Sequence, residues 1–419
     1  MPRPLKIAVV VGVFPVVSQT FIINQINTLI DAGHQVSIYA YRKGTKNIVH
    51  HSLNKHHLLD RVIYFEKHHN SKLMRIFQYK KWIIKNIFVV KWLAFFKSIN
   101  VFKYGKEALS LGLFFESQWF LKHTDFDVIH THFGQNARRI AYLKSLGFIP
   151  NKTKLVTTFH GYDLKPNNTE FYKNKYAILF KQSNAFTVNT IYLKNILNEL
   201  QPQLNNIHLL PVGLDTTYFK RQHLKTDSTY FDLVFCGRLI ALKAPDIAID
   251  IIHELHKLGY TQVRLHIIGT GTMQTQLEDK IKVFNLEASV FLVGDLIQRD
   301  IIQLYEQADA FLFPGIKLPE TGLAETQGLV LQEAQAMELP VIVSDVGGMK
   351  YGLIPNETGF LIQEKNSLAF VKAIESLILN PDLKKEMGSK ARAYVCDHFD
   401  NEILRTKLVY LYNKVVASA

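Results

Sequence analysis

The sequence has little cysteine and no long apolar run, and both absences restrict what the protein can be. Its cysteines, Cys236 and Cys396, are too few for a disulfide framework and lack the spacing of metal ligands, so we expect a reduced, cytoplasmic setting. No stretch of about 18 uninterrupted apolar residues is present, which predicts no transmembrane helix. The apolar run at residues 5–11 is too short for a secretion signal and predicts a first buried strand.

The composition is that of a folded protein. Hydrophobic residues make up 47% and charged residues 20% of the 419 positions, which excludes a largely disordered chain. The chain is longer than a domain with a single hydrophobic core usually is, and its length suits two domains of roughly 200 residues each. The formal net charge of +13 favours anionic partners, and by itself it leaves nucleic acid, an acidic membrane surface and phosphorylated substrates open.

Short apolar stretches alternate with helical patterns along the whole chain. This order predicts an α/β protein with two Rossmann-like, doubly wound domains that face a central cleft. The pattern is interrupted around Pro202, which places the expected domain boundary after residue 203. We therefore predict an N-terminal domain at residues 1–203, a C-terminal domain at 204–400, and a terminal helix at 401–419 that packs back on the first domain.

Two glutamates, Glu325 and Glu333, stand on either side of the predicted start of a helix near Gly328. Backbone N–H groups at a helix start lack partners within the helix and suit a phosphate, while the two carboxylates could hold sugar hydroxyls. The alternative is a surface helix with two unrelated glutamates, because this spacing is common. The N–H groups concerned belong to Thr326, Gln327, Gly328, Leu329 and Val330.

Two cations, Arg238 and Lys243, follow a predicted strand that ends at Gly237. Ligands of open α/β sheets bind beyond the carboxyl ends of the strands, so these side chains would be placed to neutralise a diphosphate. The alternative is a solvated loop with two ordinary basic residues.

Taken in order, these residues resemble a known family, glycosyltransferase family 4, which is a large retaining family of the GT-B fold. The matching motifs are GRL at 237–239, Lys243, IIGTG at 267–271, VGD at 293–295, the two glutamates, GG at 347–348 and ETGFL at 357–361. The similarity covers nearly the whole chain and is strongest from residue 231 to residue 362. The stretch FPVVSQTFI at 14–22 resembles the branch that builds bacterial exopolysaccharide, capsule and O-antigen units.

The resemblance implies a nucleotide-sugar site in the C-terminal domain and an acceptor site in the N-terminal domain. It implies that Arg238 and Lys243 bind the donor diphosphate, that Glu325 contacts the donor sugar and that Glu333 holds the ribose. The donor would be a UDP- or GDP-sugar, with no metal or other cofactor, since the two cations and the helix start stabilise the leaving diphosphate. The residues expected beside the base are Gly294 and Leu296.

In the N-terminal half, polar residues end two successive predicted strands. His130 and His132 end one strand, and His160 ends the next, followed by Asp163. A histidine there can donate to a sugar hydroxyl or transfer a proton, and a structural core histidine is the alternative for either member of the first pair. The resemblance favours His132 and His160 as the active-site histidines. It leaves Asp163 to orient His160 or to contact the acceptor, and it places Gly12 beside the donor.

Three positions depart from the pattern of the family. Ala244 replaces a glycine, Tyr351 replaces a glutamate, and Gln19 replaces a glutamate that is frequent in the exopolysaccharide branch. These differences leave the diphosphate site intact and the identity of the donor open.

One segment fits neither half, and we call it the basic aromatic segment. From Lys67 to Lys106 it contains ten Lys or Arg and no Asp or Glu. This pattern suits a helix in the interface of an anionic membrane, where a lipid-linked acceptor would be reached, and equally suits core residues with a basic rim. No nucleic-acid-binding motif accompanies the charge, so nucleic acid is not expected. The bulky residues are Trp82, Ile83, Ile84, Ile87, Phe88, Trp92, Phe95 and Phe96.

The expected function is transfer of a sugar from a nucleotide sugar to a saccharide or lipid-linked saccharide in bacterial surface polysaccharide synthesis, with retention. The expected location is the cytoplasm, with a peripheral position on the inner face of the cytoplasmic membrane if the basic aromatic segment contacts lipid. Two alternatives stay open: a nucleotide-sugar epimerase on the same fold, and a non-catalytic nucleotide-sugar-binding protein. Arg238, Lys243, the two glutamates and His160 argue against the second.

Overall fold

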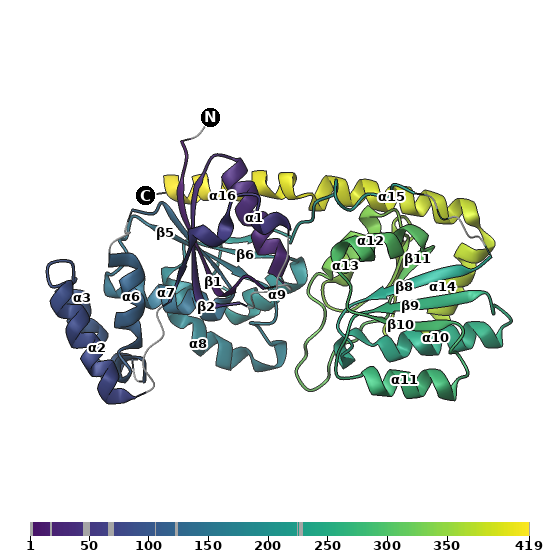
Figure 1. Ribbon diagram of the computed structural model, residues 1–419, viewed down its shortest axis with the longest axis horizontal. Helices are drawn as coiled ribbons and strands as arrows, with labels where there is room; N and C mark the ends of the chain where they lie inside the picture. Colours follow the sequence, from purple (N-terminus) through teal and green to yellow (C-terminus); the bar gives the residue numbers. More distant parts are fainter. Residues whose placement is uncertain are drawn as a thin grey trace.

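The computed structural model describes residues 3–16, 19–44, 51–65, 71–104, 106–121, 125–223, 225 and 229–418. Two α/β domains lie side by side, and the last two helices run along both of them (Figure 1). Each domain is built on one parallel sheet, so the expectation of two Rossmann-like domains is confirmed.

The N-terminal sheet has seven strands in the order β3-β2-β1-β4-β5-β6-β7. The chain therefore changes direction across the sheet between β1 and β4, where a doubly wound fold opens a crevice. The strands are β1 (Lys6–Phe14), β2 (Gln35–Lys43), β3 (Val62–Tyr64), β4 (Val128–His132), β5 (Lys154–Phe159), β6 (Ala185–Val188) and β7 (Ile207–Leu209). The helices are α1 (Thr20–Asp31), α2 (Lys72–Lys85), α3 (Trp92–Ser98), α4 (Val101–Tyr104), α5 (Lys106–Leu109), α6 (Gly112–Leu121), α7 (Gly134–Leu146), α8 (Thr169–Gln182) and α9 (Ile191–Leu200).

The C-terminal sheet has six strands in the order β10-β9-β8-β11-β12-β13, with the same change of direction between β8 and β11. The strands are β8 (Phe231–Cys236), β9 (Val263–Ile268), β10 (Val290–Gly294), β11 (Ala310–Phe313), β12 (Val341–Ser344) and β13 (Gly359–Ile362). The helices are α10 (Pro245–Lys257), α11 (Gln274–Val283), α12 (Gln298–Gln307), α13 (Leu329–Ala336), α14 (Ser367–Leu379), α15 (Pro381–Phe399) and α16 (Asn401–Ala417).

The N-terminal sheet extends beyond the expected boundary at residue 203. Strand β7 comes after that residue and pairs in parallel with β6, with Ile207 opposite Phe186. Pro202 lies in a turn between α9 and β7, so it ends the helix without ending the domain. The sheet therefore continues to Leu209, because the turn after α9 is short and the apolar strand that follows it pairs with the edge of β6.

The two last helices connect the domains. Val395 and Phe399 of α15 are buried in the core of the C-terminal domain. Helix α16 instead packs on the N-terminal domain, where Leu408 and Tyr412 are buried in one cluster with residues of β1 and α1 such as Val9. The C-terminus of the chain thus belongs to the first domain in space (Figure 1).

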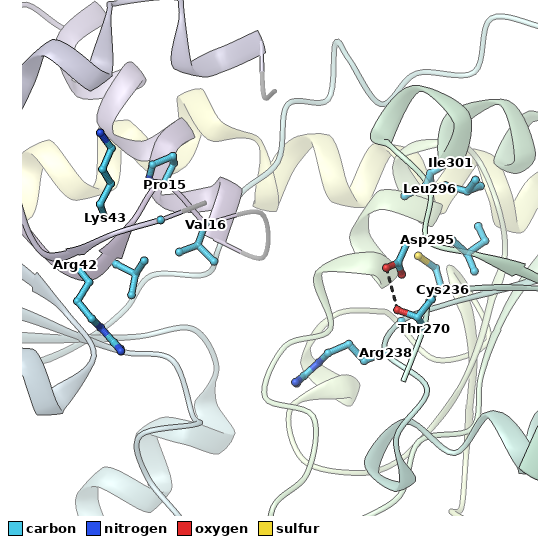
Figure 2. Close-up of a pocket in the computed structure, with 15 residues that line it drawn as sticks. Pro15, Val16, Arg42, Lys43, Cys236, Arg238, Thr270, Asp295, Leu296 and Ile301 are labelled. Atoms are coloured by element: carbon cyan, nitrogen blue, oxygen red, sulfur yellow. Dashed lines mark hydrogen bonds between the residues drawn. The ribbon is translucent and has the colours of Figure 1, made fainter. Parts of the chain in front are cut away.

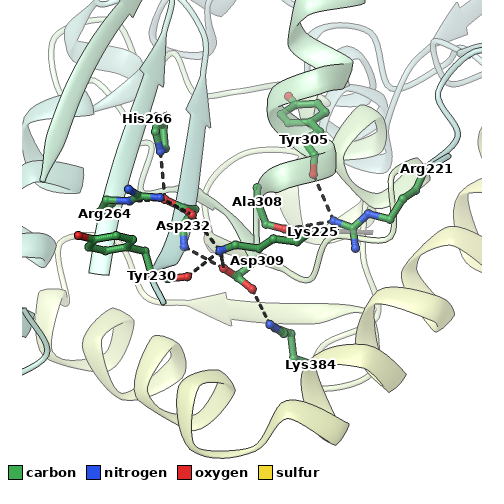
Figure 3. A network of polar contacts seen from close by, with 10 residues as sticks. All are labelled: Arg221, Lys225, Tyr230, Asp232, Arg264, His266, Tyr305, Ala308, Asp309 and Lys384. Atoms are coloured by element: carbon green, nitrogen blue, oxygen red, sulfur yellow. Dashed lines mark hydrogen bonds and ion pairs between the residues drawn. The ribbon is translucent and has the colours of Figure 1, made fainter. Parts of the chain in front are cut away.

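A buried group of charges fixes the amino ends of the C-terminal strands (Figure 3). Asp232 in β8 and Asp309 before β11 share the ammonium group of Lys225, at 2.8 and 2.5 Å. Arg264 of β9 also pairs with Asp232, and Lys384 of α15 pairs with Asp309. Each buried carboxylate therefore has cationic partners that offset its loss of hydration. Ligands bind at the opposite edge of such sheets, so we assign this group a structural role.

Candidate active site

A cavity of about 930 Å³ lies between the two domains, at the carboxyl ends of their strands. Arg42 and Lys43 line it at the end of β2, and Arg238, Thr270 and Asp295 line it after β8, β9 and β10 (Figure 2). Both sheets present to this cavity the edge at which doubly wound folds bind their ligands. The fold thus brings together residues that are more than 250 positions apart in the sequence (295 − 42 = 253).

A close approach of two loops shapes the C-terminal wall of the cavity. Gly269, directly after β9, has φ +126°, and a Cβ at this position would lie 2.1 Å from the carbonyl oxygen of Gly237. The next residue, Thr270, donates its hydroxyl to Asp295 at 2.9 Å. The loops after β8, β9 and β10 therefore pack against each other through backbone, which requires glycine at residue 269. Gly294 ends β10, and Leu296 lines the cavity.

The two cations after β8 have different surroundings. Arg238 is exposed, and its guanidinium group extends into the cavity (Figure 2). Lys243 is largely buried, its ammonium group lies 5.1 Å from the ring centroid of Phe313, and it forms an ion pair with Glu325. Strands β8 and β11 are neighbours in the sheet, so the loops that follow them meet. Lys243 and Glu325 were expected on different parts of the donor, and their pairing was not foreseen.

The surroundings of Glu325 keep its carboxyl group ionised. Burial acts to raise the pKa of this carboxyl, but the charge and hydrogen bond of Lys243 and the N–H groups of Thr326 and Gly328 outweigh burial and hold the pKa below its ordinary value. An ionised carboxylate is a strong acceptor for sugar hydroxyls.

The N–H groups of the predicted phosphate loop lie between Glu325 and the first turn of α13. Those of Thr326 and Gly328 help to hold down the pKa of the Glu325 carboxyl. Leu329 and Val330 begin α13. Binding of a donor phosphate by the N–H groups of residues 326–330 stays a prediction.

The side chains of Thr326 and Gln327 are directed to the other domain and to the linker. Thr326 donates its hydroxyl to the carbonyl oxygen of His160 at 3.0 Å, and its own carbonyl oxygen accepts from the hydroxyl of Thr190 at 2.8 Å. The amide of Gln327 pairs with both backbone groups of Val212, at 2.7 and 2.8 Å. The expected donor contact of these two residues therefore does not involve their side chains, which connect the domains.

Glu333 is a partly buried carboxyl group on α13. It lines a small pocket together with Thr20 and Asn24 of α1 and with Asp215 and Gln298. Burial raises the pKa of Glu333 to about 8, so the group carries a proton at neutral pH and can both donate and accept a hydrogen bond.

The raised pKa of Glu333 predicts a specific pH dependence of stability. The folded protein keeps this proton up to about pH 8, whereas an unfolded glutamate loses it near 4.5. The folded state therefore binds more protons in this window, and the free energy of unfolding falls as the pH rises through it. Glu333→Gln should remove this slope and, at about pH 9, should be more stable than the wild type by on the order of a few kcal/mol.

Thermal unfolding from about pH 5 to about pH 9 measures the effect of Glu333→Gln. Glu287→Gln, at an exposed glutamate, is the control and should retain the slope of the wild type. Equal slopes in wild type and Glu333→Gln would contradict the prediction.

His132 and His160 meet at the ends of the adjacent strands β4 and β5. Nδ1 of His132 and Nε2 of His160 are 3.0 Å apart, and the two rings are stacked. Burial lowers the pKa of both groups, that of His132 to about 3, so both are neutral at physiological pH. Within the described part of the chain, Nε2 of His132 is buried and has no hydrogen-bond partner. Two neutral imidazoles that share one hydrogen bond can fix each other's tautomer at the acceptor side.

Asp163 acts on the backbone around His160. Its carboxylate accepts from the N–H groups of Gly134 at 2.6 Å, and of His160 and Gly161 at 3.1 Å each. These bonds hold the turn after β5 against the start of α7. Asp163 is only 5% exposed, which corrects the expectation of an acceptor contact and leaves the orienting role.

His130 is a structural residue. Its Nδ1 lies 2.5 Å from the hydroxyl of Tyr412, and its Nε2 lies 2.6 Å from the hydroxyl of Thr158. Both ring nitrogens therefore have partners inside the core. The alternative of a core histidine therefore applies to His130. His132 is also buried, at 1% exposed, and its role in the active site stays a prediction.

Gly12 lies inside β1, near the end of the strand, and its contact with the donor stays a prediction. A Cβ at this position would have only ordinary contacts, at 3.5 Å, with the side chain of Asn136. Pro15, Arg42 and Lys43 form the N-terminal wall. Sequence reasoning missed these cations, although basic residues at the end of an apolar strand were the signal that identified Arg238 and Lys243.

Two further searches concern the described residues only. They contain no group of three or more His, Cys, Asp or Glu side chains placed to hold a metal ion. No helix in the same part of the chain is long and apolar enough to cross a membrane.

Two family models divide the chain between them. The model described as Glycosyltransferase Family 4 matches residues 18–218, and the model described as Glycosyl transferases group 1 matches residues 216–394. Together with the two facing Rossmann-like domains, these matches define a glycosyltransferase of the GT-B class. The chain belongs to glycosyltransferase family 4, which confirms the resemblance seen in the sequence.

Similar proteins span the whole chain. The amylovoran biosynthesis glycosyltransferase AmsK of Erwinia amylovora is 26% identical over 414 residues, which cover 96% of this chain and 98% of the relative. WcaL of Salmonella typhimurium, named for colanic acid biosynthesis, is 24% identical over 413 residues, 98% of this chain and 100% of the relative. Among solved structures, Anabaena HepE in complex with UDP has a TM-score of 0.72 at 16% identity and covers 98% of this chain and 100% of its own. The structural likeness confirms the GT-B fold.

Proposed function

We propose that this glycosyltransferase moves a sugar from a UDP-sugar to a saccharide acceptor, with retention, in the synthesis of a bacterial surface polysaccharide. The observation that carries the proposal is the cavity between the domains, with Arg238 on one wall and the Lys243–Glu325 pair next to Thr326, which contacts His160. The nucleotide is inferred from HepE, which is solved with UDP and with UDP-glucose. The polysaccharide is inferred from the names of AmsK and WcaL.

In the proposed reaction, the bond between the sugar C1 and the phosphate oxygen of the donor breaks. The hydroxyl oxygen of the acceptor forms its bond to C1 on the same face, and the acceptor proton passes to the leaving phosphate. Arg238 and Lys243 stabilise the negative charge that develops on the diphosphate. Lys243 is paired with Glu325, so donor binding requires this ammonium group to interact with the carboxylate and with a phosphate at the same time.

We propose further that the acceptor saccharide is carried on a lipid at the inner face of the cytoplasmic membrane. The support is the basic aromatic segment, which lies in the N-terminal domain, the domain that provides the acceptor wall of the cavity. The protein would then be peripheral, bound through one surface of that domain.

The experiment that tests the proposal separates the roles of the two glutamates. UDP-, GDP- and ADP-sugars are first compared by thermal shift, and transfer is then assayed with the stabilising donor, with and without acceptor. Glu333→Gln should weaken binding of free UDP by roughly tenfold, because a hydrogen-bond partner of the ribose is altered. Glu325→Gln should leave UDP affinity unchanged or higher, since it releases Lys243 from its ion pair, but should abolish most of the transfer.

Glu287→Gln is the matched control for both variants, because Glu287 is exposed on the C-terminal domain. Equal loss of UDP affinity in Glu325→Gln and Glu333→Gln would refute the division of roles. Conversion of the donor sugar without any acceptor would indicate an epimerase instead of a transferase.

A further inference from the structure

The segment of the N-terminal domain that comprises α2, α3 and α4 exposes many large apolar side chains. Helices α2 and α3 lie at the end of the domain away from the C-terminal domain (Figure 1). Phe88 and Phe102 are fully exposed, and Ile84 is 74% exposed. We call the exposed side chains of residues 71–104 the α2–α4 surface. Apolar groups this exposed and this close together mark a surface that is covered by something else.

The opposite face of the same helices belongs to the core of the domain. Trp82 of α2 and Phe95 of α3 both pack on Phe114 of α6, with ring centroids 5.5 and 4.8 Å apart. Helices that are apolar on the core side and on the outer side need a second apolar environment. The interpretation as core residues therefore applies to one side of these helices only, and the other side is exposed. The core side holds Trp82, Ile83 and Phe95, and the outer side holds Ile84, Ile87, Phe88, Trp92 and Phe96.

The charges of the α2–α4 surface are positive. Lys80, Lys81, Lys85 and Lys97 are exposed among the apolar side chains, and the sequence has no acidic residue from 67 to 106. Lys91 differs, because its ammonium group donates to the carbonyl oxygen of Phe148 at 2.7 Å, just beyond the end of α7. Lys91 is thus part of the domain structure, and the exposed lysines are available to an anionic partner.

We infer that the α2–α4 surface binds the anionic surface of a lipid bilayer. Its phenylalanines would enter the boundary between headgroups and acyl chains, and its lysines would lie on lipid phosphates. A second copy of this chain is disfavoured as the partner, because two such surfaces would bring lysines against lysines. A bilayer satisfies the apolar groups and the cations at once.

This position agrees with the proposed reaction and rests on it only for the identity of the acceptor. With α2 and α3 on the lipid, the acceptor domain lies at the membrane. The C-terminal domain, which carries Arg238 and Glu333, lies at the other end of the molecule (Figure 1). A lipid-linked acceptor and a water-soluble nucleotide sugar would then approach the cavity from different sides.

The test is flotation of the full-length protein with two kinds of vesicle, phosphatidylcholine alone or an equal mixture with phosphatidylglycerol, at low and high salt. The wild type should float with the anionic vesicles at low salt and lose most of its binding on neutral vesicles or at high salt. The triple change Lys80→Glu, Lys81→Glu and Lys85→Glu should lower the partition coefficient roughly 100-fold or more. Phe88→Ser with Phe102→Ser should lower it roughly tenfold.

Matched controls lie on the C-terminal domain. Lys282→Glu, Lys372→Glu and Lys385→Glu make the same change of net charge at exposed lysines, and Val283→Ser with Leu379→Ser removes exposed apolar groups. These controls should bind vesicles as the wild type does.

The inference is overturned if the wild type stays in the soluble fraction at low salt, or if the control triple change weakens binding as strongly as the triple change on α2. A dimer that the α2 changes dissociate, without any flotation, would assign the surface to a second copy. Transfer to a water-soluble saccharide should be unchanged in the α2 variants, so failure of lipid binding and failure of the proposed function can be told apart.

Discussion

Arg238→Ala and Lys243→Ala are each expected to lower kcat/KM at least about 100-fold, because one preorganised charge on a leaving group is typically worth about 3 kcal/mol or more. Their effects on stability should differ. Arg238 is exposed in the cavity, so its loss should leave the melting temperature unchanged. Lys243 neutralises the largely buried Glu325, so its loss leaves an uncompensated carboxylate and should cost up to about 3 kcal/mol of stability. Steady-state transfer assays and thermal unfolding measure the two effects.

A double variant separates the two roles of Lys243. Lys243→Ala combined with Glu325→Gln removes both members of the buried ion pair and should recover most of the stability, but none of the turnover. Lys282→Ala, at an exposed lysine of the same domain, serves as the control and should behave as the wild type. Near-normal turnover in both Arg238→Ala and Lys243→Ala would remove the donor-site assignment.

Gly161→Ala is expected to reduce transfer roughly 100-fold while both domains stay folded, since a shift of about 1 Å at a reacting centre can have an effect of this size. Gly161 has φ +100°, and a Cβ at this position would lie 2.1 Å from Cγ2 of Thr326. The added atom would separate His160 from the loop that carries Glu325. UDP binding should persist, because Arg238 and Glu333 lie within one domain.

Gly147→Ala is the matched control for Gly161→Ala. Gly147 has φ +90° but no atom within 4 Å of an added Cβ, so the change measures backbone strain alone. Thr326→Ser, which removes Cγ2, should restore part of the activity of Gly161→Ala. Equal activities of the two alanine variants would show that the contact with Thr326 is without importance for transfer.

Local patterns in the sequence were sufficient for the architecture. Continuous apolar strands between amphipathic helices have few stable arrangements, and a covered parallel sheet is the common one. This pattern predicted two Rossmann-like domains, and the resemblance of the motifs to a known family implied the GT-B fold, the family and the glycosyltransferase activity; these predictions are confirmed. The domain boundary predicted after residue 203 lies too early in the sequence, because Pro202 ends a helix but does not determine which sheet the next strand joins.

The candidate site likewise has residues that the sequence predicted and contacts that only the structure revealed. Arg238, Lys243, Glu325 and Glu333 were identified because they stand in the loop after a strand or around the start of a helix, and because the motifs that contain them resemble those of glycosyltransferase family 4. These are features of short stretches of chain. Their partners were not foreseen: the ion pair of Lys243 with Glu325 joins residues 82 positions apart, and the bond of Thr326 to His160 joins residues 166 apart. Contacts at such separations depend on strand order and on the docking of two domains, neither of which leaves a periodic trace in the sequence.

The basic aromatic segment shows the division most clearly. Its sequence determined that apolar and cationic side chains lie on the same helices and that no acidic residue occurs among them. Only the packing of α2 and α3 on α6 decided that Trp82 and Phe95 are core residues and that Phe88 and Phe96 are exposed. The amphipathic pattern of a helix shows that the helix has an apolar face, but not what that face contacts. Only the tertiary structure shows which neighbour buries one face and that the other face is exposed.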